Sequence, residues 1–366
     1  MGTGASINNL KDLERDAHRG SAEPCDVCDS SVTSSQCGPC GKVMCKLCCP
    51  HRDNILYTAR CIVHHNGQIV CSNRNAPTKI EAKCVTFNPA RRTMLVACEF
   101  FYQDNNCKCC VETTQWKTYT YSEKSKSFDI VTKRLHACDK NIKMVGGMCT
   151  SRKKNKSYFT YPSNKSVYKL DTFEGFKLAF EITGTCYGIA CFNDGIALSV
   201  EIATHFQSGS EWQVQLYDFR GLLCSQIFSD TDGNAYFGKP LYLCSNDSED
   251  KLFVSDEQKN TVFIFDLKCE LIAEVKDPAL LVRPRGLTCD EFENIYVACE
   301  RIIVQVLRRG QACRQLLTLN KPEVAMDLCF DVLRRQLVVI QKSGMITFFT
   351  MTPAPRLGER ALTTRF

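Results

Sequence analysis

The sequence predicts an all-β fold, a six-bladed β-propeller that follows a small cysteine-rich module. Three observations lead to this prediction. From position 84 onward the chain is similar to itself with a period of roughly 40 to 60 residues, as in propeller blades. Each copy alternates apolar and polar residues as half-buried strands do. Near the N-terminus, some of the 25 cysteines form regularly spaced pairs instead.

Composition excludes several classes of protein. The 366 residues carry a net charge of +6, which is far below that of a dedicated nucleic-acid-binding chain. No apolar run approaches the ~20 residues that span a bilayer, and the first residues lack the apolar core of a secretory signal. We therefore expect a soluble, cytoplasmic protein with reduced thiols. Membrane contact is expected only if Gly2, which fits a short N-myristoylation pattern, is acylated.

The cysteine-rich module has the spacing of a zinc-binding site. Three C-x2-C pairs precede a histidine within residues 25–51. Two such pairs complete the tetrahedral sphere that Zn²⁺ prefers, so three pairs and a histidine indicate one or two zinc ions with closed, structural coordination. The predicted ligands are Cys25, Cys28, Cys37, Cys40, Cys45, Cys48, His51 and Cys61.

The last of these ligands has competitors. His64 and His65 follow Cys61 closely, and Cys49 is a fourth candidate. The same segment, residues 55–71, also contains strand-like runs and is expected to supply the strand that closes the propeller ring. The two predictions compete for the same residues.

The order and spacing of the pairs resemble a B-box zinc finger of the tripartite-motif family. The resemblance covers about 40 residues, and the final histidine pair is displaced. No RING finger is visible, because a RING requires a histidine between its third and fifth ligands and residues 37–45 contain none. The resemblance thus implies a scaffold without ubiquitin-ligase activity of its own.

The repeats share one cysteine position on the first strand of each copy. In five copies it is occupied by cysteine, and in the first copy by Thr86; the cysteines are Cys149, Cys191, Cys244, Cys289 and Cys329. We interpret them as small buried core side chains. A ring of metal-binding thiols is the alternative, but no metal-ligand spacing supports it.

Two copies, at residues 283–311 and 239–270, resemble NHL repeats. The matching residues are Pro284, Gly286, Leu287, Asp290, Asn294, Ile295, Tyr296, Val297 and Gly310. The resemblance implies an NHL-like propeller of the tripartite-motif type, without RING or coiled coil. The expected organisation is a tail at 1–20, a zinc finger at 21–54, a propeller at 55–353 and a tail at 354–366.

Two enlarged loops between second and third strands, at residues 103–115 and 203–211, mark one face as the expected binding surface. The aromatic and histidine residues beside them are the contact candidates: Phe101, Tyr102, Trp116, His205, Phe206 and Trp212.

The turns between first and second strands are expected to be charged unequally. Blades one, two and six supply a basic arc that could hold phosphate, made of Arg91, Arg92, Arg152, Lys153, Lys154, Arg334 and Arg335. Blades four and five supply acidic turns.

The sequence favours a zinc-binding protein-interaction adaptor that recognises a macromolecule through propeller loops. Its link to ubiquitination would require a separate RING protein. The alternative is a single-stranded RNA-binding regulator, which the family resemblance implies. An enzyme is not expected, nor is a small-molecule substrate, because no nucleophile with a paired histidine, phosphate loop or open metal site is apparent.

Overall fold

The computed structural model describes the greater part of the repeat region and short pieces before it. Its described residues are 34–36, 43–45, 62–70, 79–103, 110–122, 127–131, 145–151, 154–171, 175–203, 210–246, 248–306 and 313–352. Regular structure in these ranges is β-strand, apart from one 3₁₀ turn at Pro162–Asn164. None of the described residues forms a helix with the length and apolarity needed to cross a bilayer.

Five four-stranded antiparallel sheets each use four consecutive strands. The first two sheets are β4 (Lys79–Asn88), β5 (Thr93–Gln103), β6 (Cys110–Ser122) and β7 (Ser127–Val131), then β8 (Gly147–Ser151), β9 (Lys156–Tyr161), β10 (Ser166–Asp171) and β11 (Gly175–Glu181). The third sheet is β12 (Thr185–Phe192), β13 (Gly195–Ala203), β14 (Ser210–Asp218) and β15 (Leu223–Ile227). The fourth is β16 (Tyr242–Ser245), β17 (Lys251–Asp256), β18 (Thr261–Asp266) and β19 (Leu271–Lys276). The fifth is β20 (Pro284–Cys289), β21 (Ile295–Cys299), β22 (Ile302–Val306) and β23 (Cys313–Thr318).

A further four-stranded sheet is composite. Its first three strands, β24 (Ala325–Asp331), β25 (Gln336–Gln341) and β26 (Met345–Thr352), come from the end of the repeat region. Its fourth strand is β3 (Ile62–Val70), which lies next to β26 and belongs to the segment expected to close the ring. Five blades, rather than six, are therefore continuous in the sequence.

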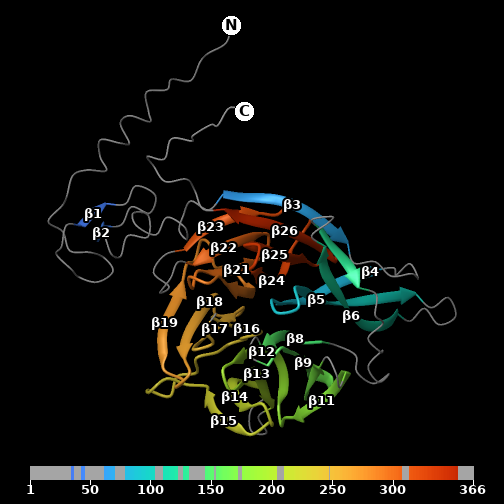
Figure 1. Cartoon of the computed structure of the whole chain (residues 1–366). Coiled ribbons are helices and arrows are strands. Elements are labelled where there is room, and N and C mark those ends of the chain that lie inside the picture. The colour runs from blue at the N-terminus through green and yellow to red at the C-terminus, as the bar shows by residue number, and fades with distance from the viewer. Residues whose placement is uncertain are drawn as a thin grey trace. The chain divides into compact units, whose positions relative to one another are not determined.

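The sheets are arranged around a common centre, as Figure 1 shows. The first strand of each sheet is innermost, and these strands contact one another in the order β4, β8, β12, β16, β20, β24 and back to β4. This arrangement confirms the all-β propeller within the compact unit Val63–Thr350.

The turns that leave the innermost strands share one design. A short polar residue at the strand end accepts backbone N–H groups from the turn, and a non-glycine residue with positive φ precedes the second strand. The accepting residues are Asn88, Ser151, Asn246, Asp290 and Asp331. The residues with positive φ are Arg92, Asn155, Glu249, Glu293 and Arg335. Four of these five turns therefore carry a long charged side chain at the residue with positive φ.

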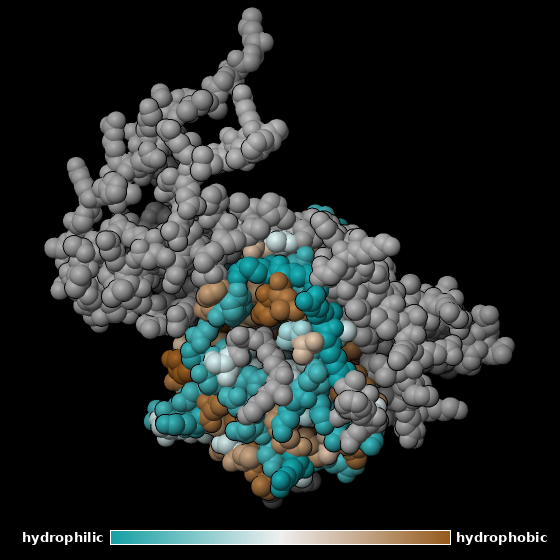
Figure 2. Space-filling model, in the orientation of Figure 1, coloured by the Kyte–Doolittle hydropathy of each residue, from teal (hydrophilic) through white to brown (hydrophobic). Residues whose placement is uncertain are grey.

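The hydrophobic core lies between blades rather than within one sheet. One cluster joins Val96 of β5 to Val338 of β25, and another joins Leu216 of β14 to Phe263 of β18. Because every inner sheet face is covered by the next blade, the apolar strands bury their side chains without a separate layer of helices. On the face drawn in Figure 2, the apolar residues form separate patches within a mostly hydrophilic surface.

One loop expectation is corrected. The segment 103–115, predicted as an enlarged loop, is largely strand: β5 extends to Gln103 and β6 begins at Cys110, with Tyr102 paired to Val111. Thr113, Thr114 and Gln115 continue the antiparallel ladder opposite Phe100, Glu99 and Cys98, because their alternation with Val111 and Trp116 suits a strand.

Outside the propeller unit, the structure describes one hairpin. Strand β1 (Ser34–Gln36) pairs antiparallel with β2 (Val43–Cys45), and Ser34 lies opposite Cys45. This hairpin falls within the segment predicted to bind zinc.

Candidate functional site

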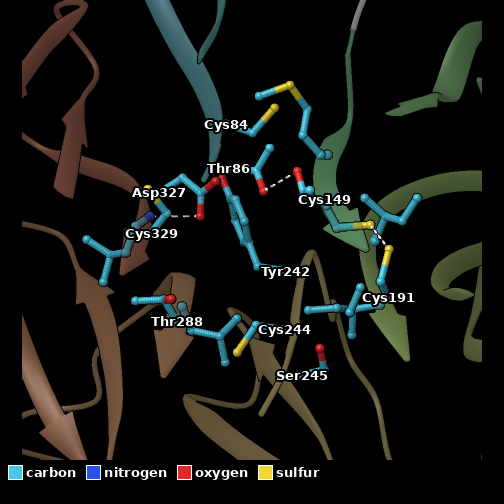
Figure 3. Close-up of a pocket in the computed structure, with 18 of the residues that line it drawn as sticks. Cys84, Thr86, Cys149, Cys191, Tyr242, Cys244, Ser245, Thr288, Asp327 and Cys329 are labelled. Carbon is cyan, nitrogen blue, oxygen red and sulfur yellow. Dashed lines mark hydrogen bonds between the residues drawn. The ribbon is translucent and has the colours of Figure 1, made fainter. Parts of the chain in front are cut away.

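A cavity of about 120 Å³ lies at the centre of the ring. Its walls are the innermost strands and the turns that follow them (Figure 3). The polar and sulfur-containing residues that line it are Cys84, Thr86, Met148, Cys149, Thr150, Cys191, Tyr242, Cys244, Ser245, Asn246, Glu249, Thr288, Asp327 and Cys329. A cavity of this volume suits a ligand the size of benzene, which occupies an engineered cavity of about 150 Å³.

Four of the five repeated cysteines, Cys149, Cys191, Cys244 and Cys329, line this cavity. The Sγ atoms of Cys149 and Cys191 lie 2.9 Å apart, across the boundary between β8 and β12. Burial raises the pKa values of Cys191, Cys244 and Cys329 well above the ordinary thiol range. These three groups are therefore neutral thiols near pH 7 and poor nucleophiles. The core interpretation stands for Cys149, Cys191, Cys289 and Cys329, which are buried, whereas Cys244 is half-buried.

Asp327 places a carboxyl group on the wall of the cavity. Its Oδ2 accepts the N–H of Val85 at 2.9 Å, and its Oδ1 accepts the N–H of Leu328 at 2.9 Å. Burial raises the pKa of this carboxyl to about 7, although both N–H groups favour the charged form. Close approach of β20 requires glycine: a Cβ on Gly286 would lie 2.2 Å from Asp327 Oδ1. The result is a fixed acid whose protonation changes near neutral pH.

Tyr242 projects into the cavity beside Asp327, as Figure 3 shows. Burial, followed by the negative charge of Asp327, raises the pKa of Tyr242. The phenol therefore keeps its proton near neutral pH and can donate a hydrogen bond to a ligand oxygen. Asp327 and Tyr242 together offer a titratable acid–base group and a fixed donor.

Glu249 adds a second carboxyl group to the cavity wall. It lies in the turn after β16, is 6% exposed and contributes to the charge that raises the pKa of the Cys191 thiol. None of the described residues that line the cavity is lysine, arginine or histidine. Within the described ranges, no three His, Cys, Asp or Glu side chains are grouped to hold a metal ion.

Most of the predicted zinc ligands lie outside the described residues. These are Cys25, Cys28, Cys37, Cys40, Cys48, His51 and Cys61, whereas Cys45 ends strand β2. Zinc binding by this set stays a prediction.

The predicted aromatic contacts are described only in part, so the binding surface that they would form stays a prediction. Phe101 and Tyr102 lie in β5, Trp116 lies in β6 opposite Ala97, and His205 and Phe206 fall outside the described residues. Trp212 lies in β14, half-buried, with its ring centroid 5.2 Å from that of Tyr187. This packing ties the Trp212 indole to its own blade.

The basic arc is partly engaged with acidic turns. Arg335, in the turn after β24, pairs with Glu291, in the turn after β20, and Arg334 pairs with Asp331. Arg91 donates to the Asn155 carbonyl, while Arg92 is exposed.

The blade-two part of the arc is described only at Lys154, because Arg152 and Lys153 lie outside the described residues. The Lys154 Nζ lies 5.2 Å from the centre of the Phe219 ring. The pair of Arg335 and Glu291 therefore joins opposite charges that the sequence places on separate arcs.

Sequence reasoning missed Asp327, Tyr242 and Glu249 as site residues. A signal for two of them was available. The residue two positions before the repeated cysteine is Gly147, Ile189 and Leu287 in three copies, but Tyr242 and Asp327 in two others. Because residues i and i+2 of a strand share one face, these polar residues had to lie beside the channel thiols.

No protein-family model matches the chain, and no curated protein matches it by sequence. Solved structures do match its fold. A structure of a protein assigned as a gluconolactonase is 14% identical, with a TM-score of 0.52, over 81% of this chain and 94% of that one. An inactive variant of virginiamycin B lyase from Staphylococcus aureus, solved with quinupristin, is 10% identical, with a TM-score of 0.49, over 79% of this chain and 100% of that one.

The first of these two structures corrects one expectation. The sequence led us to exclude an enzyme, but the propeller fold found here is shared with a chain assigned as a gluconolactonase. The exclusion was wrong because it considered nucleophile pairs, phosphate loops and open metal sites, and overlooked carboxyl and phenol groups brought together by the ring.

Proposed function

We propose that the protein is an enzyme that performs acid–base chemistry on a small organic substrate in the propeller channel. The observation that carries this proposal is the pKa of about 7 for the buried carboxyl of Asp327, beside the protonated phenol of Tyr242. A general base is most effective when its pKa lies near the working pH. Titratable groups perturbed by burial in a cleft are typical of active sites.

Hydrolysis of a small ester is the reaction that these two groups serve most directly. The Asp327 carboxylate takes a proton from a water molecule as the water oxygen bonds to the ester carbonyl carbon. The carbonyl oxygen becomes an oxyanion, to which the Tyr242 phenol donates a hydrogen bond. When the intermediate collapses, the C–O bond to the leaving group breaks, and the alkoxide takes the proton from Asp327. The products are a carboxylic acid and an alcohol.

The proposal is tested by proton release from small linear and cyclic esters of about six heavy atoms, in a weakly buffered indicator assay. We expect turnover that rises with pH through about 7, because only the ionised Asp327 accepts a proton. Tyr242→Phe removes the oxyanion donor and should lower kcat about 100-fold, with a smaller change in KM. No turnover of any ester at pH 8, with folded protein, would contradict the proposed reaction.

A macromolecular partner for the propeller is a second candidate, supported by a fold that presents loops and turns around a rigid ring. The adaptor role, a link to ubiquitination, RNA binding and the kinship with tripartite-motif NHL proteins all stay predictions. The six sheets and the position of β3 beside β26 support a ring of six blades. The aromatic and basic candidates named above are the residues to vary in binding assays.

Zinc binding is tested by metal analysis of the purified chain. We expect one or two zinc ions per chain, because the three C-x2-C pairs provide closed thiolate coordination. Replacing Cys25 and Cys28 by serine should remove at least one zinc. Cys224→Ser, which changes an exposed propeller thiol, is the control and should leave the zinc content unchanged. A zinc content unaffected by the paired substitution would contradict the prediction.

A further inference from the structure

Two of the repeated cysteines meet where the second and third sheets adjoin. Cys149 lies in β8 and Cys191 in β12, 42 positions apart in the sequence, and their Sγ atoms are 2.9 Å apart. The two strands are neighbours in the inner ring. Figure 3 shows the sulfur atoms side by side, on residues that line the cavity. The fold therefore holds two thiols from separate sheets within reach of each other.

A glycine on β8 permits this approach. Gly147 stands two positions before Cys149, so the two residues share one face of the strand. A Cβ on Gly147 would lie 2.8 Å from the carbonyl oxygen of Tyr187 and 3.3 Å from the Cα of Gly188, both in β12. A side chain at position 147 would therefore push β8 away from β12 and separate the two thiols.

The surroundings of the pair favour a bond between the two sulfurs over other thiol chemistry. Both cysteines belong to the apolar cluster that joins the two sheets, together with Ile189 and Leu198. Because burial raises the pKa of Cys191, this thiol reacts slowly near pH 7. Once one sulfur of the pair is oxidised to a sulfenic acid, however, the other is already in place to condense with it. In a neighbouring sheet, by contrast, Cys289 donates its thiol proton to the Ser245 carbonyl at 3.2 Å.

We infer that Cys149 and Cys191 form a redox site, at which hydrogen peroxide converts the two thiols into a disulfide. One sulfur, as its thiolate, attacks a peroxide oxygen; the O–O bond breaks, and a sulfenic acid and hydroxide form. The second sulfur attacks the sulfenic sulfur, the S–O bond breaks, and a second hydroxide leaves. The two thiol protons convert both hydroxides to water. The thiols thus lose two electrons in total, and the peroxide is reduced to two water molecules.

The geometry needs only a small adjustment for this step. A disulfide bond is about 2.05 Å long, so the two sulfurs approach each other by roughly 1 Å. Hydrogen peroxide is far smaller than the ligand that a cavity of about 120 Å³ accepts, so the cavity gives it a route to these residues. The bond would tie β8 to β12 and close a loop of 42 positions, so the oxidised protein should unfold at a higher urea concentration. Asp327 and Tyr242 take no part, and the site is independent of the proposed hydrolysis.

The test is peptide mapping by mass spectrometry after the folded full-length chain is treated with hydrogen peroxide and its remaining thiols are alkylated. We expect a linked pair of peptides that contain Cys149 and Cys191, about 2 Da lighter than the two separate peptides and lost on reduction with dithiothreitol. The linkage should form faster as the pH rises from 7 to 9, because the thiolate is the attacking species. Cys191→Ser should abolish it. Cys329→Ser, at the equivalent position of β24 on the same cavity wall, is the matched control and should retain it.

The same treatment in concentrated urea needs no variant and keeps the inference testable if Cys191→Ser does not fold. Unfolding separates the two thiols, so the yield of this linkage should fall to that of any other cysteine pair. A linkage that forms equally well in the unfolded chain would overturn the inference, because the fold would then not position the thiols. Peroxide treatment that leaves both thiols of the folded protein free, or that joins either one mainly to a different cysteine, would also overturn it.

Discussion

Replacing Asp327 by asparagine should lower kcat for ester hydrolysis at least about 100-fold, because a positioned general base contributes roughly 10²–10⁴-fold. Asparagine keeps the size of the side chain and one oxygen acceptor, but it cannot take a proton from water. The residual rate should also lose its pH dependence around 7, since the titrating carboxyl is gone. The measurement is kcat and kcat/KM for the best small ester between pH 5 and 9.

The matched control is Asp290→Asn in the neighbouring blade. Asp290 is also buried, with a pKa raised by burial, but it holds the turn after β20 through Phe292, Asn294 and Tyr296 and does not line the cavity. Its substitution should reduce stability and leave kcat within about threefold. If both variants lose turnover equally, the loss reflects distortion of the ring, and Asp327 is not the base.

Phe265→Ala should lower the free energy of unfolding by about 3–5 kcal/mol, the range for removing a buried phenylalanine. Phe265 is fully buried and joins blades three and four. Its ring centre lies 5.5 Å from that of Tyr236 and 6.0 Å from that of Phe237, in edge-on contacts that alanine cannot make. Urea denaturation followed by circular dichroism measures the change.

The control for this prediction is Phe228→Ala. Phe228 follows β15 and is 40% exposed, so its removal should cost about 0.5 kcal/mol or less. Equal destabilisation by the two substitutions would show that the interface between blades three and four contributes no more than the surface, contrary to the packing described here.

The sequence was sufficient to predict the propeller because its blades repeat a local pattern. The short runs of β-branched and aromatic residues in Ile295–Cys299 and Thr261–Asp266 identify buried strands, and the cysteine before each turn sets the register of the copies. The extended hairpin of β5 and β6 was not predicted. The cluster of cysteines and asparagines around residue 106 is typical of a loop, so the predicted loop took in residues that belong to the start of β6.

The candidate site was harder to predict because it exists only when the ring closes. Asp327 and Val85 are 242 positions apart in the sequence, yet a hydrogen bond joins them across the junction of the last and first sheets. A lone aspartate on an apolar strand has no local motif, and its raised pKa arises from burial by other blades. The pairing of Arg335 with Glu291 likewise depends on which blades are neighbours.

The most direct test of this account is the pKa of Asp327 itself. It can be measured by ¹³C NMR of aspartate carboxyl groups during a pH titration, with the Asp327 signal assigned by its loss in Asp327→Asn. We predict a midpoint of about 7, because burial disfavours the ionised carboxylate. A midpoint near the ordinary value of about 4 would contradict the account, because the carboxyl would then be an ordinary hydrogen-bonded group and a weak base at neutral pH.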